Sequence, residues 1–575
     1  MKAARRSSRA ASSRGPSCRE QLLDCLSITT CGALLAVALR PFQNTPFIDD
    51  WVYAWSVVEL LEHGRLRVLD WSAHVNVAQV LWGAAFGLPL GFSITALRVS
   101  TWALGLLCLC GLYLLLREVG IPRRDALIGT ATLGVNPLFS ILSYTFMTDV
   151  PFLAALVWSL YAAARAIHGR SDRWLIASAL LAAIGIGIRV IGVVTPVATA
   201  LTLALHGDSW GRRRRRVLLA LAPLMLQLLL LWWWGGHTQR VADLSGLADA
   251  PATRQRALPS ALPVLPRMLI ETLPFLAGTL GISLLPLSLA ALGALPVAAE
   301  RRGPVVRTLS IRGLLGAACL ALQLLGTPIP APLASGSTWA LLELGATEPL
   351  VPGFEEPAVP WWVGGAGTAL AFVSFAILLA GSPWLGPTAR SRRAAVGEDR
   401  ERAAMALMTW CCVGHVLLLA VLWLFYDRYA LPLFPVAIVV ASLGNAPRRP
   451  AVAVAVLALL LLVTIGGIHD HLEYNHALWE AVDGLRRAHV PDAEIDGGYV
   501  VNGWLHYARP ENAPRDAHGT LTFPGITAGA GRLAYLISNR PRPDRTLVRA
   551  VPYHRWLGRS GDILVLDRTA EPRPR

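Results

Sequence analysis

Charged residues are scarce in this chain, and their scarcity excludes an ordinary soluble fold. Only 15% of the 575 residues are charged, whereas 54% are hydrophobic. A soluble protein of this length cannot hide so much apolar surface. Apolar stretches of about 20 residues, the length that crosses a bilayer core, recur from Leu22 almost to Gly467. A secretion signal would supply only one short apolar segment. The repetition therefore predicts an integral membrane protein.

Cysteine is absent from the hydrophilic C-terminal part of the chain. All eight cysteines lie at or before Cys412, and their spacing matches no zinc site. We therefore expect no disulfide framework in the C-terminal part. The adjacent Cys411 and Cys412 are interpreted as packing or lipid-facing sulfur.

Acidic residues are outnumbered, 37 against 52 Lys and Arg, which gives a formal net charge of +15. In a soluble protein this excess would suggest a nucleic-acid partner. Here the arginines cluster in short loops between apolar segments, and cytoplasmic loops of membrane proteins collect Lys and Arg. The distribution of the arginines therefore predicts which loops lie in the cytoplasm, and we expect no nucleic-acid partner.

The alternation of basic and non-basic loops predicts about thirteen membrane spans. The predicted spans are residues 22–39, 94–116, 126–143, 151–167, 174–188, 190–205, 217–234, 268–295, 313–325, 361–379, 403–425, 430–443 and 451–465. The basic tail at 1–21 and the run of five arginines at 212–216 are placed in the cytoplasm. An odd number of spans sends residues 468–575 to the outer side.

The predicted fold class is therefore an all-α polytopic membrane protein of the cell membrane with a small α/β extracytoplasmic C-terminal domain. The helical bundle spans residues 22–467, and its first outer segment, 41–91, is too long for a connector and too polar to cross the membrane. In the C-terminal domain, 468–575, periodicity predicts a helix at 474–488. Strands are expected at 498–504, 533–537, 546–551 and 563–566.

Acidic side chains stand at two places on the predicted outer face. Asp49 and Asp50 follow the first span, and Asp149 ends the third. Each group stands where a helix would begin, so a carboxylate there could serve as a cap. A carboxylate at the hydrocarbon boundary is costly, however, unless it faces water, a partner or a substrate. Both interpretations, structural cap and functional acid, remain open at this point.

Three motifs in this order resemble those of the polytopic membrane glycosyltransferases with the C-type fold. This superfamily includes the protein O-mannosyltransferases and the bacterial aminoarabinose and arabinofuranose transferases. The motifs are Asp49-Asp50 with the segment to Gly64, Met147-Thr148-Asp149-Val150-Pro151, and Arg428-Tyr429-Ala430-Leu431-Pro432-Leu433-Phe434-Pro435.

The resemblance implies an enzyme that moves a hexosyl or pentosyl group from a polyprenyl-phosphate donor to an extracytoplasmic glycan, lipid or protein of the cell envelope. Transfer would invert the anomeric centre by direct displacement. Asp49 matches the candidate catalytic base that removes the proton of the acceptor hydroxyl. Asp50 would orient that base or the acceptor, and Asp149 would be the second acidic ligand.

The leaving phosphate would need cationic ligands. Arg428 is the first candidate, because a guanidinium pairs with phosphate bidentately; an ion pair with Asp427 is the structural alternative. Further candidates for binding the donor phosphate are Tyr429, Arg189, Arg98 and His74. Tyr429 could equally be an interfacial anchor. Relatives often have a His or Lys with consecutive prolines where this chain has Ala73-His74-Val75.

A need for a divalent cation is left open by the sequence. His469, His471 and His476 follow the last span, and we interpret them as interfacial polar residues rather than a metal site. The rival function is a transporter or lipid flippase, in which the same charges would bind a headgroup during alternating access. Carboxylates concentrated on one face, with few inside the spans, favour the enzyme.

Overall fold

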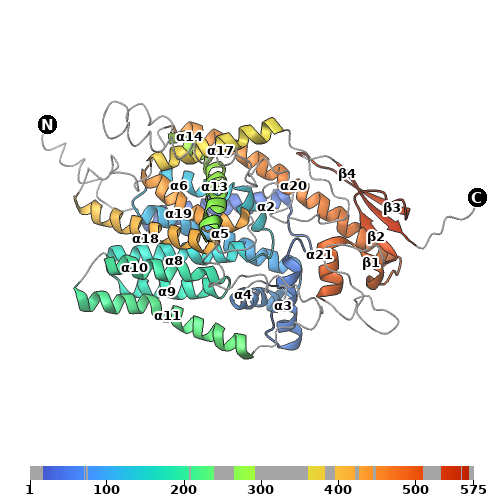
Figure 1. Cartoon of the computed structure of the whole chain (residues 1–575), viewed down its shortest axis with the longest axis horizontal. Helices are drawn as coiled ribbons and strands as arrows, with labels where there is room; N and C mark the ends of the chain where they lie inside the picture. The colour runs from blue at the N-terminus through green and yellow to red at the C-terminus, as the bar shows by residue number, and fades with distance from the viewer. Residues whose placement is uncertain are drawn as a thin grey trace, which may run out of the picture.

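The computed structural model describes residues 17–69, 72, 76–205, 209–237, 265–291, 361–381, 395–420, 427–444, 449–508, 533–557 and 560–568. These residues form a helical bundle with one small sheet near the C-terminus (Figure 1). The predicted span at 313–325 and the candidate ligand His74 lie outside the described residues.

Several helices are apolar enough to cross a membrane. Within the described ranges, five qualify by length and composition, or six if the helix pair bent by 73° near residue 284 is one span. The five are α2 (Cys18–Leu39), α5 (Ile94–Glu118), α8 (Asp149–Gly169), the part Glu401–Ala420 of α18 (Ala395–Ala420), and α20 (Pro450–Arg487). The protein is thus multi-pass, and the number thirteen stays a prediction.

The other bundle helices are shorter or bent. They are α6 (Arg123–Gly134), α7 (Pro137–Leu142), α9 (Asp172–Ile186), α10 (Val194–Leu205), α11 (Trp210–His237), α13 (Leu265–Ser283), α14 (Leu285–Ala291), α17 (Trp361–Gly381) and α19 (Leu433–Gly444). The single helix expected at 126–143 is broken between α6 and α7. Asn136 causes this break, because its side chain accepts hydrogen bonds from the backbone N–H groups of Leu138 and Phe139. Pro137 then starts α7.

The segment 41–91, predicted to lie outside, contains two helices, α3 (Asp50–His63) and α4 (Val77–Leu90). Gly64 ends α3 in the left-handed conformation that glycine adopts without a steric penalty. Helix α4 packs close to α5, since Trp82 donates a hydrogen bond to the carbonyl of Ser100 at 3.2 Å. The segment is therefore a folded part of the protein.

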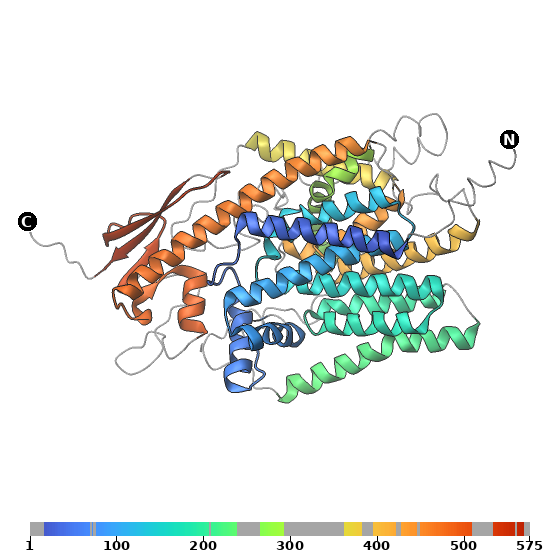
Figure 2. The same ribbon diagram turned by 180° about the vertical axis from the view of Figure 1, so that it is seen from behind.

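Helix α20 joins the bundle to the sheet without a break (Figure 2). Its 38 residues extend about 57 Å at the usual rise per residue. The helix expected at 474–488 is thus the continuation of the last predicted span. No helix boundary separates residue 467 from residue 468.

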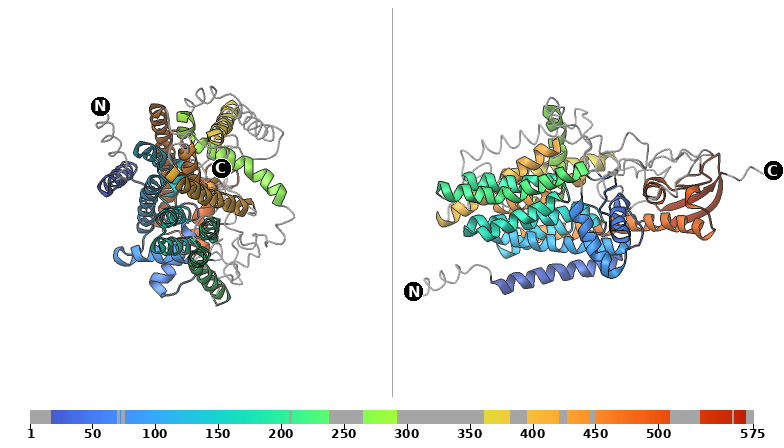
Figure 3. Two further views of the ribbon diagram at one scale, coloured as in Figure 1. Left: turned by 90° about the vertical axis from the view of Figure 1, so that its left-hand side faces the viewer. Right: turned by 90° about the horizontal axis from the view of Figure 1, so that it is seen from below.

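The small sheet lies at the end of the molecule opposite the start of α2 (Figure 3). Its strands are β1 (Ile495–Asp496), β2 (Tyr535–Ser538), β3 (Thr546–Tyr553) and β4 (Gly561–Asp567), in the order β1-β2-β4-β3. β1 pairs parallel to β2, and the other two pairs are antiparallel. The three strands expected between 533 and 566 are confirmed in place, with small changes of their ends.

The strand expected at 498–504 is wrong. Residues Gly498–Asn502 form helix α21, which continues in a π-helical turn, Gly503–Tyr507. The Asn502 side chain bends back, accepting a hydrogen bond from Gly497 N–H and donating one to Asp496. This local network competes with strand pairing. The residue types of the segment alone do not reveal the network.

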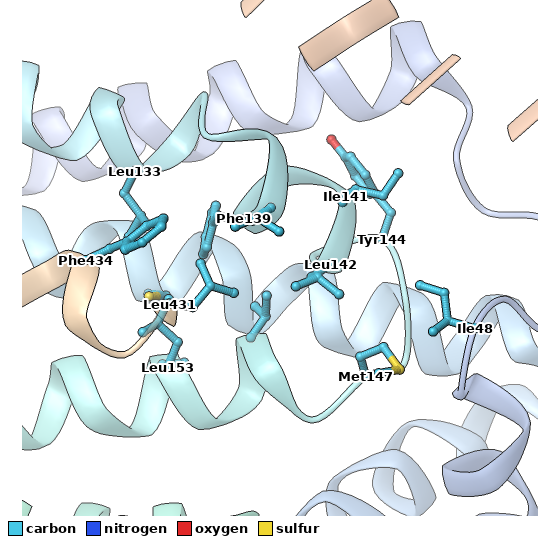
Figure 4. Close-up of a cluster of buried hydrophobic side chains, with 14 of the residues drawn as sticks. Ile48, Leu133, Phe139, Ile141, Leu142, Tyr144, Met147, Leu153, Leu431 and Phe434 are labelled. Atoms are coloured by element: carbon cyan, nitrogen blue, oxygen red, sulfur yellow. The ribbon is translucent and has the colours of Figure 1, made fainter. Parts of the chain in front are cut away.

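All three motif segments contribute buried side chains to the main core of the bundle. Figure 4 shows Ile48, Met147 and Leu431 in one cluster of apolar side chains with Leu142 and Leu153. These residues are buried, and burial of each such side chain stabilises the fold by roughly 1.5–3 kcal/mol. The chain positions that carry Asp49, Asp149 and Arg428 are therefore anchored by packing.

Candidate functional site

Asp49 lies at the start of α3, but its side chain does not cap the helix. No cap hydrogen bond is formed from this position. Instead Arg428, on the 3₁₀ turn Asp427–Ala430, donates from Nη2 to Asp49 Oδ2 at 3.1 Å. The Asp49 side chain keeps 18% of its surface exposed, against 8% for that of Arg428. The carboxylate is thus held by a cation and remains accessible to small groups.

The backbone before Asp49 is strained. Ile48 has a φ of 49°, a value that a β-branched residue seldom adopts. Its side chain is buried in the core cluster, which holds the backbone in this conformation. Such strain costs on the order of 1–3 kcal/mol and is concentrated at functional sites. Here it forms the turn from which Asp49 departs.

A second ion pair lies at the start of α8. Arg189 Nη2 is 2.8 Å from Asp149 Oδ1, and Arg189 Nε donates to Thr148 Oγ1 at 2.7 Å. Arg189 occupies the extended link between α9 and the following 3₁₀ turn, Val190–Val193. Asp149 is in the first turn of its helix, where the dipole favours a negative charge.

Tyr429 links the two ion pairs. The guanidinium carbon of Arg189 is 5.7 Å from the centre of the Tyr429 ring, and that of Arg428 is 5.8 Å from it. Both distances suit cation–π attraction. The four charged groups and Tyr429 therefore form one cluster, which we call the acid–arginine cluster: Asp49, Asp149, Arg189, Arg428 and Tyr429.

The charges of the cluster also act on buried Tyr53 of α3. Burial, and then the charge of Asp49, raise the pKa of Tyr53 far above its usual value, while Arg189 and Arg428 oppose the rise. Tyr53 is therefore a neutral hydroxyl. For Arg428, burial lowers the pKa, but Asp49 and Asp149 outweigh it, so the pKa lies well above its ordinary value.

Asp427 adds a titratable group beside the cluster. Burial raises its pKa to about 6, although the N–H and the charge of Arg428 act in the opposite direction. The Arg428 N–H donates to Asp427 Oδ1 at 2.7 Å. The charge of Asp149 adds to the rise in pKa.

Asp50 and Arg98 form a separate, completely buried ion pair. Arg98 Nη2 lies 3.2 Å from Asp50 Oδ2, and both side chains have no exposed surface. Asp50 Oδ1 accepts from Phe146 N–H at 2.7 Å, while Arg98 donates to the carbonyls of Gln43 and Thr45. Burial raises the pKa of Asp50 to about 6, and the charge of Arg98 limits the rise. The pair ties the segment before Asp49 to the segment before Asp149.

One contact of Asp49 was missed by the sequence analysis. Tyr499, on α21, donates its hydroxyl to Asp49 Oδ1. No motif marks this tyrosine, and its segment was expected to be a strand. The site therefore includes a residue from the C-terminal part of the chain.

The structure thus brings together Asp49, Asp149, Arg189, Arg428 and Tyr429, and it pairs Asp50 with Arg98 next to them. Their chemical roles remain predictions. In the part of the chain that the structure describes, no group of three or more His, Cys, Asp or Glu side chains could hold a metal ion. His469 stacks on Trp556 instead, and His471 packs against Phe47.

Comparison with known proteins gives one family match and several structural likenesses. Residues 79–234 match the family described as dolichyl-phosphate-mannose-protein mannosyltransferase. No curated protein sequence matches the chain significantly.

Three solved structures illustrate the likenesses. ArnT from Cupriavidus metallidurans bound to undecaprenyl phosphate has 12% identity and a TM-score of 0.41, covering 95% of this chain and 98% of ArnT. The oligosaccharyltransferase AglB from Archaeoglobus fulgidus has 14% identity and a TM-score of 0.37, covering 81% and 59%. The Pmt1-Pmt2 complex of S. cerevisiae has 15% identity and a TM-score of 0.31, covering 38% of this chain and 34% of that one. At TM-scores below 0.5, these likenesses support no inference about the function of the chain.

The family match covers most of α4, all of α5 to α10 and most of α11, and with them Arg98, Asp149 and Arg189. It includes the second of the three motifs, whereas Asp49 and Arg428 lie outside it. Over residues 79–234, the family match confirms the expected resemblance to the protein O-mannosyltransferases.

Proposed function

We propose that this protein is a membrane glycosyltransferase that moves a sugar from a polyprenyl-phosphate donor to an extracytoplasmic acceptor. The observation that carries the proposal is the contact of Asp49 with Arg428 beside the pair Asp149–Arg189. A carboxylate base and two guanidinium groups in one cluster are what such a displacement requires. The match of residues 79–234, which include Asp149 and Arg189, to a mannosyltransferase family supports the proposal of sugar transfer.

Asp49 would act as the general base. The acceptor oxygen forms a bond to the anomeric carbon of the sugar while its proton passes to Asp49. The bond from the anomeric carbon to the phosphate oxygen breaks, and its electron pair leaves with the polyprenyl phosphate. A carboxylate has about four acceptor positions, so contacts with two donors leave room for the acceptor hydroxyl.

The arginines would receive the phosphate. Negative charge grows on the leaving phosphate as the bond breaks, and fixed cations stabilise it without reorganisation. The guanidinium carbons of Arg189 and Arg428 lie 5.7 and 5.8 Å from the centre of the Tyr429 ring, so a phosphate beside this ring could reach both guanidinium groups. Asp149 would hold Arg189 in place.

Asp50 and Arg98 would position the site from within the protein. The Arg98 side chain is fully buried and engages Asp50 and two backbone carbonyls. In this proposal it therefore orders the segment 43–50 and does not bind the phosphate. Asp50 orients Asp49 through the same segment.

A transporter or flippase is the alternative that the charges also permit. The two functions can be distinguished in detergent, because without closed compartments only sugar transfer gives a measurable product. Purified protein would be mixed with a panel of polyprenyl-phosphate hexoses and pentoses and candidate envelope acceptors. A transferase releases polyprenyl phosphate and yields a glycosylated acceptor of inverted configuration.

The matched control for this experiment is Asp49→Asn, which should bind donor but release polyprenyl phosphate roughly 10²- to 10⁴-fold more slowly than the wild type. Equal release by both proteins would refute Asp49 as the base. Binding of donor without release by the wild-type protein, combined with donor translocation in vesicles, would overturn the proposal in favour of a transporter.

A further inference from the structure

The C-terminal part of the chain contacts the turn that carries Asp49 at several points. Trp479 of α20 donates its indole N–H to the carbonyl of Pro46 at 3.1 Å. The ring of His471, also on α20, lies edge-on to Phe47, with centroids 5.3 Å apart. These contacts hold Pro46 and Phe47, which lie just before Asp49, against the C-terminal half of α20.

Residues of α21 and of the turn after it also pack on Trp51, which lies in the first turn of α3. Trp51 makes edge contacts with Tyr499 and Tyr507, with centroid distances of 6.0 and 5.8 Å. Gly503 lies so close to the Trp51 indole that no space remains for a Cβ. The α21 segment is therefore seated on the start of α3 in a single arrangement.

This packing delivers the Tyr499 hydroxyl to Asp49. Tyr499 donates to Oδ1, while Arg428 donates to Oδ2. The two donors come from separate parts of the chain and hold separate oxygens. Arg428 alone would leave the carboxylate free to turn about its bond to Cβ, whereas a donor on each oxygen fixes the plane of the group.

We propose that Tyr499 is a positioning residue for Asp49, so that the C-terminal part of the chain completes the transferase site. The inference rests on the proposed function of Asp49 as base. Tyr499 need not touch the sugar or the acceptor. It fixes which lone pairs of the carboxylate point toward the incoming hydroxyl, and productive geometry of this kind is sensitive to small displacements.

The first test is Tyr499→Phe, which removes the hydroxyl and keeps the ring contact with Trp51. We expect the turnover number for sugar transfer to fall roughly 10- to 100-fold, the effect of losing a hydrogen bond to a charged group. The donor KM should remain unchanged, because Arg428 and Arg189 are intact. The matched control is Tyr474→Phe, which removes a hydroxyl bonded to Asn539 at 2.8 Å in the same part of the protein. It should leave transfer unchanged.

A double-mutant cycle separates positioning from general stability. In the Asp49→Asn background, Tyr499→Phe should cause no further loss of the residual rate, because the hydroxyl acts through the carboxylate. An equal loss in both backgrounds would refute the proposal and assign Tyr499 a structural role. A wild-type rate for Tyr499→Phe, with Asp49→Asn inactive, would also refute it while leaving the proposed function intact. If Asp49→Asn itself transfers at the wild-type rate, the proposed function fails instead.

Discussion

Arg428 donates a hydrogen bond to Asp49 at 3.1 Å, although 379 positions separate the two residues in the chain. The contact joins the first outer segment to the turn before α19. Because Ile48 and Leu431 lie in the same apolar core, both partners come from backbone that packing holds in place. The pair therefore has a preorganised geometry.

Arg428→Ala should weaken binding of the donor phosphate. Losing a charge-assisted contact costs about 1.5–3 kcal/mol, which corresponds to a loss of affinity of roughly 10- to 100-fold. Binding of undecaprenyl phosphate to the purified protein is the measurement. Arg549→Ala, which removes an exposed arginine paired with Glu480, is the control and should bind normally. Unchanged affinity and turnover in a folded Arg428→Ala protein would remove this arginine from the site.

Breaking the Asp50–Arg98 pair should destabilise the protein. Removing one partner leaves a buried charge without compensation, at a cost of about 3–5 kcal/mol. Arg98→Met should therefore lower the unfolding temperature markedly, and Asp50→Asn with Arg98→Met should recover part of the loss. Thermal unfolding in detergent tests this expectation. A wild-type melting temperature for Arg98→Met would contradict this expectation. If Asp50→Asn loses transfer while Asp49→Asn keeps it, Asp49 is not the base.

Asp427 should make stability depend on pH. Its folded pKa, about 6, lies above the ordinary value of 3.8, so the folded state holds this proton more tightly than the unfolded state. The resulting stabilisation is complete below about pH 4 and is lost as pH rises through about 6. Asp427→Asn removes this contribution.

The Asp427→Asn variant should therefore gain stability relative to the wild type between pH 4 and pH 7, by up to about 3 kcal/mol. Parallel unfolding curves at several pH values provide the measurement. Asp50 also has a raised pKa, so some pH dependence persists in the variant. A stability difference that does not vary with pH would contradict the assignment.

The predicted topology places the sheet outside the cell and the arginine run inside. Ser560 is exposed next to β4, and Ser209 is exposed just before α11. In a cysteine-free background, Ser560→Cys should react with a membrane-impermeant maleimide in intact cells. Ser209→Cys should react only after permeabilisation. The reverse pattern would invert the topology.

The sequence predicts most of the site because the charged residues of the acid–arginine cluster stand in recognisable motifs near the ends of predicted spans. Asp49, Asp149 and Arg428 were chosen from their places at span ends, and the structure places them in one cluster. The separate roles of Asp49 and Asp50 were harder to predict, because adjacent residues at a helix start point in different directions. The partner of Asp50, Arg98, lies on a different helix.

Tyr499 could not be predicted for a different reason. Its segment contains Tyr499, Val500 and Val501, residue types that suit a strand. In the structure, local hydrogen bonds of Asn502 and the packing of Gly503 on Trp51 accompany a helix instead. The contact of Gly503 with Trp51 is a tertiary effect that a local pattern does not contain. The same limit applies to α20, which continues past residue 467 and packs against β3 and β4.

The measurement that tests the account most directly is the transfer rate of Asp49→Asn. Asparagine caps a helix about as well as aspartate but cannot take a proton from the acceptor. The variant should fold and bind donor, yet transfer sugar roughly 10²- to 10⁴-fold more slowly than the wild type. Asp149→Asn serves as the comparison at the second acidic position. A folded Asp49→Asn protein that transfers sugar at the wild-type rate would contradict the central claim.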